Sequence, residues 1–158
     1  MTLSTSKSIE IVTGKTLKLK NVLSRYVISQ DGTEMQKVMH MFNSYMKANR
    51  LTPYGPTTIN TKSVFENGSL VQRSRMMVQV RETPAKVEPP YSFSELIRVE
   101  NCVMARYHGN AASVQMAHGK IQVYAFENNI KLKGETYTVL IEQDGNDIMA
   151  DVFMEAET

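Results

Sequence analysis

Apolar residues recur with a helical period in two stretches of the chain that are 79 positions apart. The first stretch has apolar side chains at positions i, i+3, i+4, i+7, i+10 and i+11, which form one face of an α-helix. A shift of 79 residues carries this stripe onto a second one, in which five of the six positions can still face a core. The sequence therefore predicts two amphipathic helices, with the stripes Met35, Val38, Met39, Phe42, Tyr45 and Met46, and Val114, Ala117, His118, Ile121, Tyr124 and Ala125.

A strand is expected before each helix and a hairpin after it. The preceding strands end at Ser24-Arg25-Tyr26 and at Ala105-Arg106-Tyr107, each after an apolar run. After the helices, Asn67-Gly68 and Asp144-Gly145 supply the positive φ angles that a tight hairpin turn needs. Each half is therefore predicted to be strand, helix, strand, strand, with hairpin strands at 57–64, 70–81, 135–142 and 147–156.

A proline-rich segment separates the two halves. Residues 82–90 hold three of the five prolines and lack a hydrophobic period, which predicts an extended linker. We expect one domain over residues 1–158, with a first βαββ unit at about 20–82, a linker at 83–91 and a second unit at about 92–157. Ahead of them, Ile9 and Ile11 alternate like an extra edge strand, and Thr13-Gly14 predicts a turn.

These elements predict an α+β fold. A βαββ unit places its helix on one face of an antiparallel sheet and leaves the other face open. Two pseudo-symmetric units would form an antiparallel sheet with the helices on one face and a cleft between the halves. Strand period assigns the following to the helix side: Leu70, Met76, Val78, Val80, Ile148, Ala150, Val152 and Met154. The open side receives Arg73, Arg75, Met77, Gln79, Met149, Asp151, Phe153 and Glu155.

Composition narrows the class of protein. Apolar residues at 42% and charged residues at 22% are typical of a folded domain. One cysteine can form neither an intramolecular disulfide nor a cysteine-built metal site, and no metal-ligand spacing is present. No stretch approaches the roughly 18 apolar residues of a membrane helix, and Met1 to Lys7 are not followed by a secretory apolar region. We therefore expect a cytoplasmic protein without membrane, metal or cofactor.

The net charge of +2 is the sum of two opposite halves. Residues 1–83 hold 12 basic and 5 acidic side chains, whereas residues 84–158 hold 6 and 11. The basic residues are scattered and lack interleaved aromatics, so nucleic-acid binding is not expected. The split instead predicts that a basic half faces an acidic half across the groove, or that it docks an acidic partner or a second copy, which leaves a homodimer open.

Several soft motifs together resemble the GyrI-like small-molecule-binding superfamily, which contains gyrase inhibitory proteins and the effector-binding domains of multidrug-responsive regulators in bacteria. The motifs are the duplicated unit, Asn101 to Gly109, Glu127-Asn128-Asn129, Gly134 to Tyr137, and Asp151-Val152-Phe153-Met154. The resemblance implies a ligand cleft lined by aromatics and by an acidic residue that receives lipophilic cations. It implies that Asp151 is this acidic residue and Tyr137 the aromatic before it. The chain departs in having Glu155 for the usual proline and no tryptophan.

The candidate site follows from the open face of the last strand. A carboxylate beside an aromatic ring, as in Asp151 and Phe153, suits an organic cation, although a solvated sheet face would show the same spacing. His108 at a turn, His118 on the helix stripe and Cys102 in an apolar strand are interpreted as structural residues. The candidate ligand-binding residues are Asp151, Phe153, Tyr137, Tyr107, Tyr26, Met77 and Met149.

Three functions remain open. The first is a non-catalytic, stand-alone binding protein that takes a small apolar molecule, neutral or cationic, in the cleft. The second is a protein-protein adaptor or inhibitor, for example of a toxin, a secreted protein or a topoisomerase, which docks through charged surfaces and methionines. The third is a small hydrolase that uses Tyr107 or Tyr137 with an acidic residue, since a few stand-alone members of the superfamily hydrolyse small electrophiles.

Overall fold

The computed structural model describes residues 9–27 and 32–157, and it has the expected α+β fold. Within these ranges it contains six strands and two α-helices, and every strand pairing described below is antiparallel. The elements are β1 (Glu10–Val27), α1 (Gly32–Ala48), β2 (Thr57–Glu66), β3 (Ser69–Gln79), β4 (Tyr91–Asn110), a 3-10 turn (Ala111–Ser113), α2 (Gln115–Glu127), β5 (Leu132–Asp144) and β6 (Asp147–Ala156).

The chain divides into two compact units. The α1 unit comprises Lys18–Ile97, and the α2 unit comprises Met1–Leu17 together with Arg98–Thr158. Strands β1 and β4 are long enough to contribute to both units. The N-terminal part of β1 thus belongs to the same unit as the C-terminal half of the chain. Hydrophobic periodicity does not reveal this grouping.

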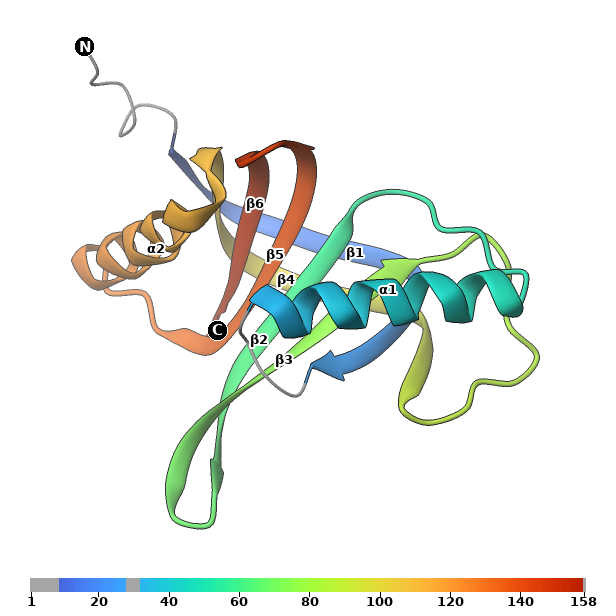
Figure 1. Ribbon diagram of the computed structural model, residues 1–158. Coiled ribbons are helices and arrows are strands. Elements are labelled where there is room, and N and C mark those ends of the chain that lie inside the picture. Colours follow the sequence, from blue (N-terminus) through green and yellow to red (C-terminus); the bar gives the residue numbers. More distant parts are fainter. Residues whose placement is uncertain (1–8, 28–31, 158) are drawn as a thin grey trace. The chain divides into compact units, whose positions relative to one another are not determined.

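In the α1 unit, strand β3 pairs with β1 on one side and with β2 on the other, and α1 lies across this sheet (Figure 1). The buried residues Val38, Phe42 and Met46 follow the predicted helical stripe. They belong to one core cluster with the helix-facing positions of the sheet, which are Leu23, Val27, Met76, Val78 and Val80. The amphipathic pattern therefore gives the covered face of this unit correctly.

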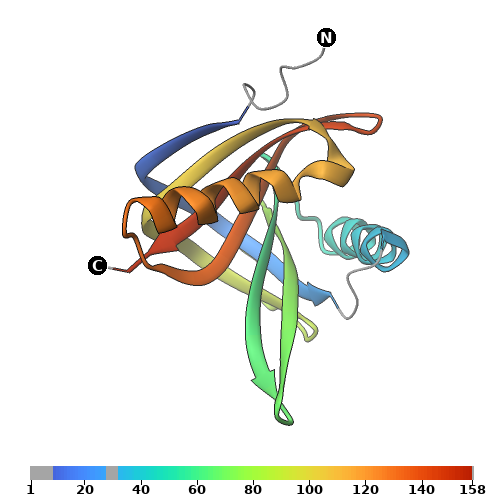
Figure 2. The ribbon, with the colours of Figure 1, turned by 90° about the vertical axis from the view of Figure 1, so that its left-hand side faces the viewer.

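The α2 unit repeats this arrangement. Strand β6 pairs with β4 and with β5, and α2 lies across one face of the sheet (Figure 2). The small residues Ala117 and Ala125 flank Ile121 on the buried side of the helix. The core of the unit groups Ala117 and Ile121 with residues of two strands, Val103, Ala105, Tyr107, Ile148, Ala150, Val152 and Met154. The predicted helix side of the last strand is confirmed.

Both helices end with the same hydrogen-bond pattern, 79 residues apart. Leu51 N–H donates to the carbonyl of Met46, and Ile130 N–H donates to that of Ala125, each at 2.8 Å. Between them lies a residue with positive φ, Arg50 at 58° and Asn129 at 57°. This is the Schellman arrangement, in which a left-handed residue ends the helix and later N–H groups satisfy its last carbonyls. The asparagine-containing segments Asn49-Arg50 and Asn128-Asn129 are therefore helix ends.

Both hairpins have two-residue turns, but the second turn lies one residue later than the predicted Asp144-Gly145 pair. In the first, Glu66 pairs with Ser69, and Asn67 and Gly68 are the central residues with φ of 52° and 79°, as predicted. In the second, Asp144 pairs with Asp147, so the turn is formed by Gly145 and Asn146. Only Gly145 of these two has a positive φ. A turn with glycine at the first central position has a different geometry from Asn-Gly, which explains the shift.

For one side chain of the first hairpin, Leu70, the alternation of the strand predicts the wrong surroundings. Leu70 was expected under α1, yet it is exposed and lies opposite Phe65 near the free end of the hairpin. The core cluster under α1 draws on Met76 and Val78 at the other end of β3, and on Val80 just beyond it. The hairpin therefore continues beyond the part of the sheet that the helix covers, and parity alone cannot show where a helix stops.

The strand register also corrects the alignment of the two halves. Val22 pairs with Gln79, and Cys102 pairs with Glu155, so β1 and β4 correspond with a shift of 80 rather than the predicted 81. Asn21 and Asn101, each with a positive φ, match at the same shift. Because a one-residue slip reverses every side chain, Tyr26 and Tyr107 do not occupy equivalent positions.

The N-terminal part of the described chain is one strand rather than a strand and a turn. β1 runs without interruption from Glu10 to Val27, and Gly14 adopts a φ of 69° within it. A glycine with positive φ inside a strand is typical of a bulge, which bends the strand without ending it. The Thr13-Gly14 pair was therefore wrongly interpreted as a turn.

The proline-rich segment lacks a named helix or strand until β4 begins at Tyr91. Its start is held by Glu82, whose carboxylate accepts hydrogen bonds from the Thr52 backbone N–H at 2.6 Å and from the Thr52 hydroxyl at 2.8 Å. These hydrogen bonds lower the pKa of the exposed Glu82 carboxyl group. The start of the segment is thus tied to the turn that follows α1.

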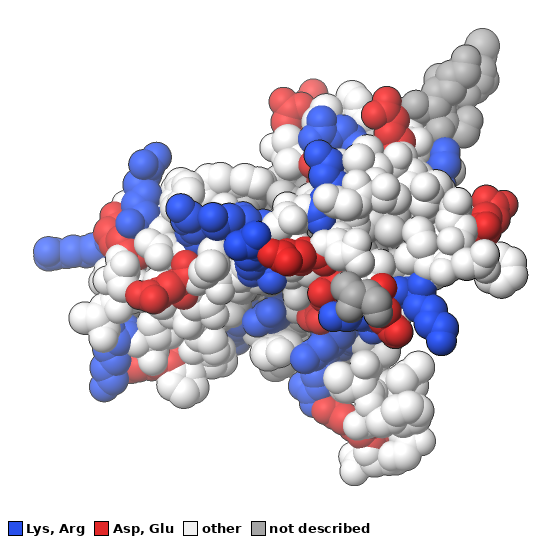
Figure 3. Space-filling view, turned by 180° about the vertical axis from the view of Figure 1, so that it is seen from behind, with Lys and Arg blue, Asp and Glu red and all other residues white. Residues whose placement is uncertain are grey.

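Charge follows the units less sharply than it follows the halves of the chain. Lys18–Ile97 holds 11 basic and 6 acidic residues, a net of +5, and the remaining residues hold 7 and 10, a net of −3. The face drawn in Figure 3 shows basic and acidic side chains interspersed rather than separated. No helix in the described ranges is long and apolar enough to cross a membrane.

Candidate functional site

The candidate site lies on the open face of the α2 unit, which we define as the face of the β4–β6–β5 sheet opposite α2. Its positions follow from the register, because directly paired residues share a face. Asp151 pairs with Arg106 and Val139, and the next row joins Phe153 to its two neighbours. The rows from one end to the other are Met104–Phe153–Tyr137, Arg106–Asp151–Val139 and His108–Met149–Glu142.

The middle row holds a buried carboxylate with its own cationic partner. Arg106 Nε donates to Asp151 Oδ1 at 2.8 Å, and Arg106 Nη2 donates to Oδ2 at 2.9 Å. The Asp151 side chain is 11% exposed, whereas that of Arg106 is 52% exposed. Two parallel hydrogen bonds of this kind fix both groups and balance the buried charge. Asp151 is therefore held in place by a cation of the chain itself.

The row beside it is apolar and buried. Tyr137 and Phe153 are 6% and 9% exposed, and Met104 on the other side of Phe153 is also buried. Tyr137 and Phe153 lie opposite each other on neighbouring strands, one row from Asp151 on the same face. The structure thus brings together three of the predicted residues, Asp151, Phe153 and Tyr137, on one face.

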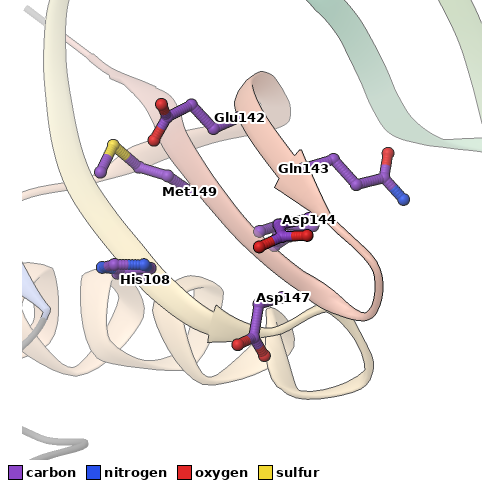
Figure 4. Close-up of a pocket in the computed structure, with 7 residues that line it drawn as sticks. His108, Glu142, Gln143, Asp144, Asp147 and Met149 are labelled. Carbon is purple, nitrogen blue, oxygen red and sulfur yellow. The ribbon is translucent and has the colours of Figure 1, made fainter.

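A cavity of about 400 Å³ lies at the hairpin end of the same sheet. Glu142, Met149 and His108 lie on one side of the hairpin, while Gln143 points the other way (Figure 4). The lining is completed by Asp144, Asp147 and Ile148. Met149, a predicted site residue, therefore borders a real cavity, and three carboxylates surround it.

His108 is part of a strand rather than of a turn. β4 continues to Asn110, where the Asn110 side chain accepts a hydrogen bond from Ala112 N–H and caps the short 3-10 turn. The exposed His108 therefore faces the cavity from the sheet. A turn was expected here because His108-Gly109 directly precedes the helical period.

The other predicted site residues do not join this face. Tyr107 lies on the helix side, where it is fully buried and its hydroxyl donates to the Asn110 carbonyl at 2.7 Å. Tyr26 and Met77 belong to the α1 unit, in which Tyr26 is exposed and Met77 is buried. A hydrolytic role for Tyr107 with Asp151 has no support, because the two side chains point to opposite faces of one sheet.

Cys102 and His118 have the structural surroundings expected for core residues. Cys102 is fully buried, and this burial raises the pKa of its thiol to about 11. Burial lowers the pKa of His118, whose Nδ1 lies 3.2 Å from the Val114 carbonyl and whose Nε2 lies 3.4 Å from the Thr138 hydroxyl. His118 therefore lies on the covered side of the sheet. Cys102 pairs with Glu155 and has the parity of Met104 and Arg106, so it lies on the other face although it is fully buried.

Sequence reasoning missed Arg106 and a set of buried polar residues in the α1 unit. Arg106 was treated as part of an Arg-Tyr pair at a strand end, and its pairing with Asp151 depends on a register that the sequence does not state. In the α1 unit, Arg75 Nε donates to Asn60 Oδ1 at 2.9 Å, and the buried Thr58 hydroxyl has no hydrogen-bond partner among the described residues. Within the same ranges, no cluster of three metal-ligating side chains occurs.

Comparison with solved structures gives the fold. The chain superimposes on the crystal structure of the EcmrR C-terminal domain with a TM-score of 0.71, 17% identity, and coverage of 95% of this chain and 98% of that one. It shares the fold of that domain. No family model and no curated protein sequence matches the chain.

The matched part is a portion of a longer protein in EcmrR. Against the EcmrR chain in its DNA complex, the TM-score is 0.70 at 17% identity, and the match covers 96% of this chain and 58% of that one. A hydrolase from Listeria innocua matches with a TM-score of 0.54 at 11% identity, over 95% and 92% of the two chains. SAV2435 bound to tetraphenylphosphonium matches with 0.50 at 10% identity, over 94% and 93%.

Proposed function

We propose that this chain is a small-molecule-binding domain of GyrI-like type, built from two duplicated βαββ units, and that an apolar molecule binds on the open face of the α2 unit. The observation that carries the proposal is the row of aromatic side chains, Tyr137 and Phe153, directly beside the buried Asp151 carboxylate. The matching helix ends and strand registers support the duplication.

The chemistry of this face suits a ligand with a large ring surface. Two aromatic side chains supply apolar area, and a carboxylate next to them favours an organic cation over an anion. Arg106 already balances the charge of Asp151. A neutral ligand would pack beside this ion pair, whereas a cation would take the place of Arg106. The proposed ligand class is therefore apolar and either neutral or cationic.

The neighbouring cavity provides an approach to the face. Its volume of about 400 Å³ lies within the range of about 300–1,000 Å³ that is typical of small-molecule sites. The carboxylates of Glu142, Asp144 and Asp147 line it and would raise the local concentration of cations. Tyr137 and Phe153 are covered, so the ligand binds only to protein molecules in which these rings are exposed. The apparent affinity is the intrinsic affinity multiplied by the fraction of protein in that open state.

SAV2435 shares the fold and was solved with tetraphenylphosphonium, so this cation is a suitable probe. The shared fold alone does not transfer the ligand, since the two chains are 10% identical. Likewise, our expectation that the chain binds no nucleic acid stays a prediction, because EcmrR was solved in a DNA complex through a chain that extends beyond the matched part.

Thermal unfolding with tetraphenylphosphonium tests the proposal. At a concentration of 100 times the Kd, binding would stabilise the fold by about 2.7 kcal/mol, which for a chain of this size raises the Tm by roughly 5–10 °C. The shift should shrink in Asp151→Asn and persist in Glu100→Gln, a matched change at an exposed carboxylate on β4. If the Tm stays unchanged both with this cation and with neutral aromatic ligands, the proposed binding site is contradicted.

A second candidate function, a protein-protein adaptor, is favoured by exposed aromatic side chains. Phe126 on the outer side of α2 is 85% exposed, and Phe65 in the β2–β3 hairpin is 78% exposed. Figure 3 shows the free end of that hairpin as largely uncharged. A pull-down from the native host at low and high salt, with Phe65→Ser and Phe126→Ser as variants, tests this function. An adaptor would lose a defined partner with one of these variants, and no partner above background at low salt would exclude it.

A further inference from the structure

Arg106 occupies the position that a cationic ligand of Asp151 would need. Its guanidinium makes both hydrogen bonds to the carboxylate oxygens from the neighbouring strand. A carboxylate that accepts two charge-assisted hydrogen bonds from one guanidinium offers no equally favourable direction to a second cation. Any organic cation that reaches this face therefore competes with a group of the protein.

The two partners of this ion pair differ in their freedom to move. Asp151 is buried on a central strand, so its carboxylate stays where the sheet places it. Arg106 has half of its side chain exposed, and its long stem allows the guanidinium to turn into water without a change in the backbone. Displacement would therefore proceed by release of Arg106 and not by movement of Asp151.

We propose that Arg106 is a specificity-determining residue, an internal cation that a positively charged ligand must displace from Asp151. The proposal rests on the function proposed above, because it concerns the same face. It assigns to Arg106 two consequences. Cations without enough apolar surface to offset the loss of the ion pair are excluded, and neutral apolar ligands bind without disturbing the pair.

The expected change in cation affinity follows from the strength of the hydrogen-bonded Arg106–Asp151 ion pair, which is partly buried. Removing the competing guanidinium frees the carboxylate for the ligand, and a hydrogen bond to a charged group is worth a change in affinity of roughly 10- to 150-fold. Because Arg106 is half exposed and the pair is partly screened by solvent, we expect the low end of this range, about tenfold.

The experiment measures binding of two ions of the same shape by isothermal titration calorimetry. Tetraphenylphosphonium is the cation and tetraphenylborate the anion, so both present the same ring surface. The proteins are the full chain, Arg106→Met, Arg106→Lys, and the control Arg98→Met. Arg98 lies on the same strand and pairs with Glu100 at the surface, which makes it a matched arginine outside the proposed site. Methionine keeps the apolar stem of Arg106 and removes only its charge.

The proposal expects Arg106→Met to bind tetraphenylphosphonium about tenfold more tightly than the wild type. It expects Arg106→Lys to lie between the two, because lysine keeps the charge but loses the paired geometry. Arg98→Met should behave as the wild type does, and tetraphenylborate should bind Arg106→Met more weakly than the wild type.

Two failures are distinguishable. If tetraphenylphosphonium binds the wild type and both Arg106 variants with the same affinity, or more weakly to Arg106→Met, Arg106 does not compete and the proposal is overturned. If none of the four proteins binds either ion, the function proposed for this face fails. Should Arg106→Met not fold, the comparison of Arg106→Lys with the wild type decides the matter, since equal affinities would overturn the proposal.

Discussion

The Cys102 thiol is fully buried on β4, and its burial disfavours the thiolate. A thiol with a pKa of about 11 is almost entirely protonated at pH 8, and the reactive species is the thiolate. We therefore expect the native protein to resist an aromatic disulfide reagent at pH 8 and to react with one equivalent after unfolding in guanidinium. Rapid reaction of one equivalent with the native protein, followed by absorbance, would contradict the buried position.

His118 gives the fold a dependence on pH. Burial depresses its folded-state pKa below the usual value of about 6.5, so the unfolded chain binds more protons as the pH falls below that value. The stability that neutral His118 provides is present above pH 6.5 and is lost as the pH falls through the lower, folded-state pKa. Urea unfolding should show a smaller loss of stability between pH 7 and pH 5 in His118→Gln than in the wild type.

Equal pH dependence in His118→Gln and the wild type would show that the His118 ring is not held in its neutral form by the core.

At the level of single residues, the sequence indicated which side of the last strand Asp151 and Phe153 occupy but not what they meet. Period-two alternation assigns a face within one strand, and this assignment holds for Asp151, Phe153 and Met149. The partner of Asp151 depends on how β4 aligns with β6, which is a long-range property. Arg106 was therefore invisible as its partner until the register was known.

The helix ends allow a prediction at the level of elements. Arg50 and Asn129 hold left-handed φ angles of 58° and 57° at equivalent positions. Glycine adopts this conformation without strain, and asparagine tolerates it better than arginine does. Arg50→Gly should raise the free energy of unfolding by about 1 kcal/mol, and Asn129→Gly by a smaller amount. Urea unfolding of the two variants checks the order.

If Arg50→Gly lowered the free energy of unfolding, the assigned helix end would be contradicted. The Arg50 side chain would then stabilise the fold by more than its left-handed backbone conformation destabilises it. Gly119→Ala within α2 is a useful comparison. Gly119 lies inside the helix, and a Cβ added there would meet no other atom within 4 Å. We expect Gly119→Ala to raise the free energy of unfolding by about 0.5–1 kcal/mol through helix propensity.

Elements with a strong local signal were predicted well. The helical stripes, the Asn67-Gly68 turn and the strand from Asp147 to Ala156 depend on neighbours in sequence, and they are confirmed. The elements that were misjudged depend on distant partners. β1 and β4 are longer than their apolar runs indicate, and a bulge at Gly14 imitates a turn. The expected cleft between the halves stays a prediction.

For the whole molecule, the matched registers place side chains of opposite charge at equivalent positions. The pairs Thr58–Met77 and Tyr137–Phe153 correspond with shifts of 79 and 76, so Arg75 on β3 is the counterpart of Asp151 on β6. Each is held by a neighbour on its own sheet, Arg75 by Asn60 and Asp151 by Arg106. The two units therefore share a strand register but differ in the chemistry of their open faces.

The most direct test of the central claim is an NMR titration of the full chain with tetraphenylphosphonium, in which backbone amide shifts report where the cation binds. We expect the largest shifts on β4, β5 and β6 around Arg106, Tyr137, Asp151 and Phe153, and we expect Asp151→Asn to weaken them. Shifts confined to the β2–β3 hairpin or to the outer side of α2, or the absence of saturable shifts, would contradict a ligand site on this face.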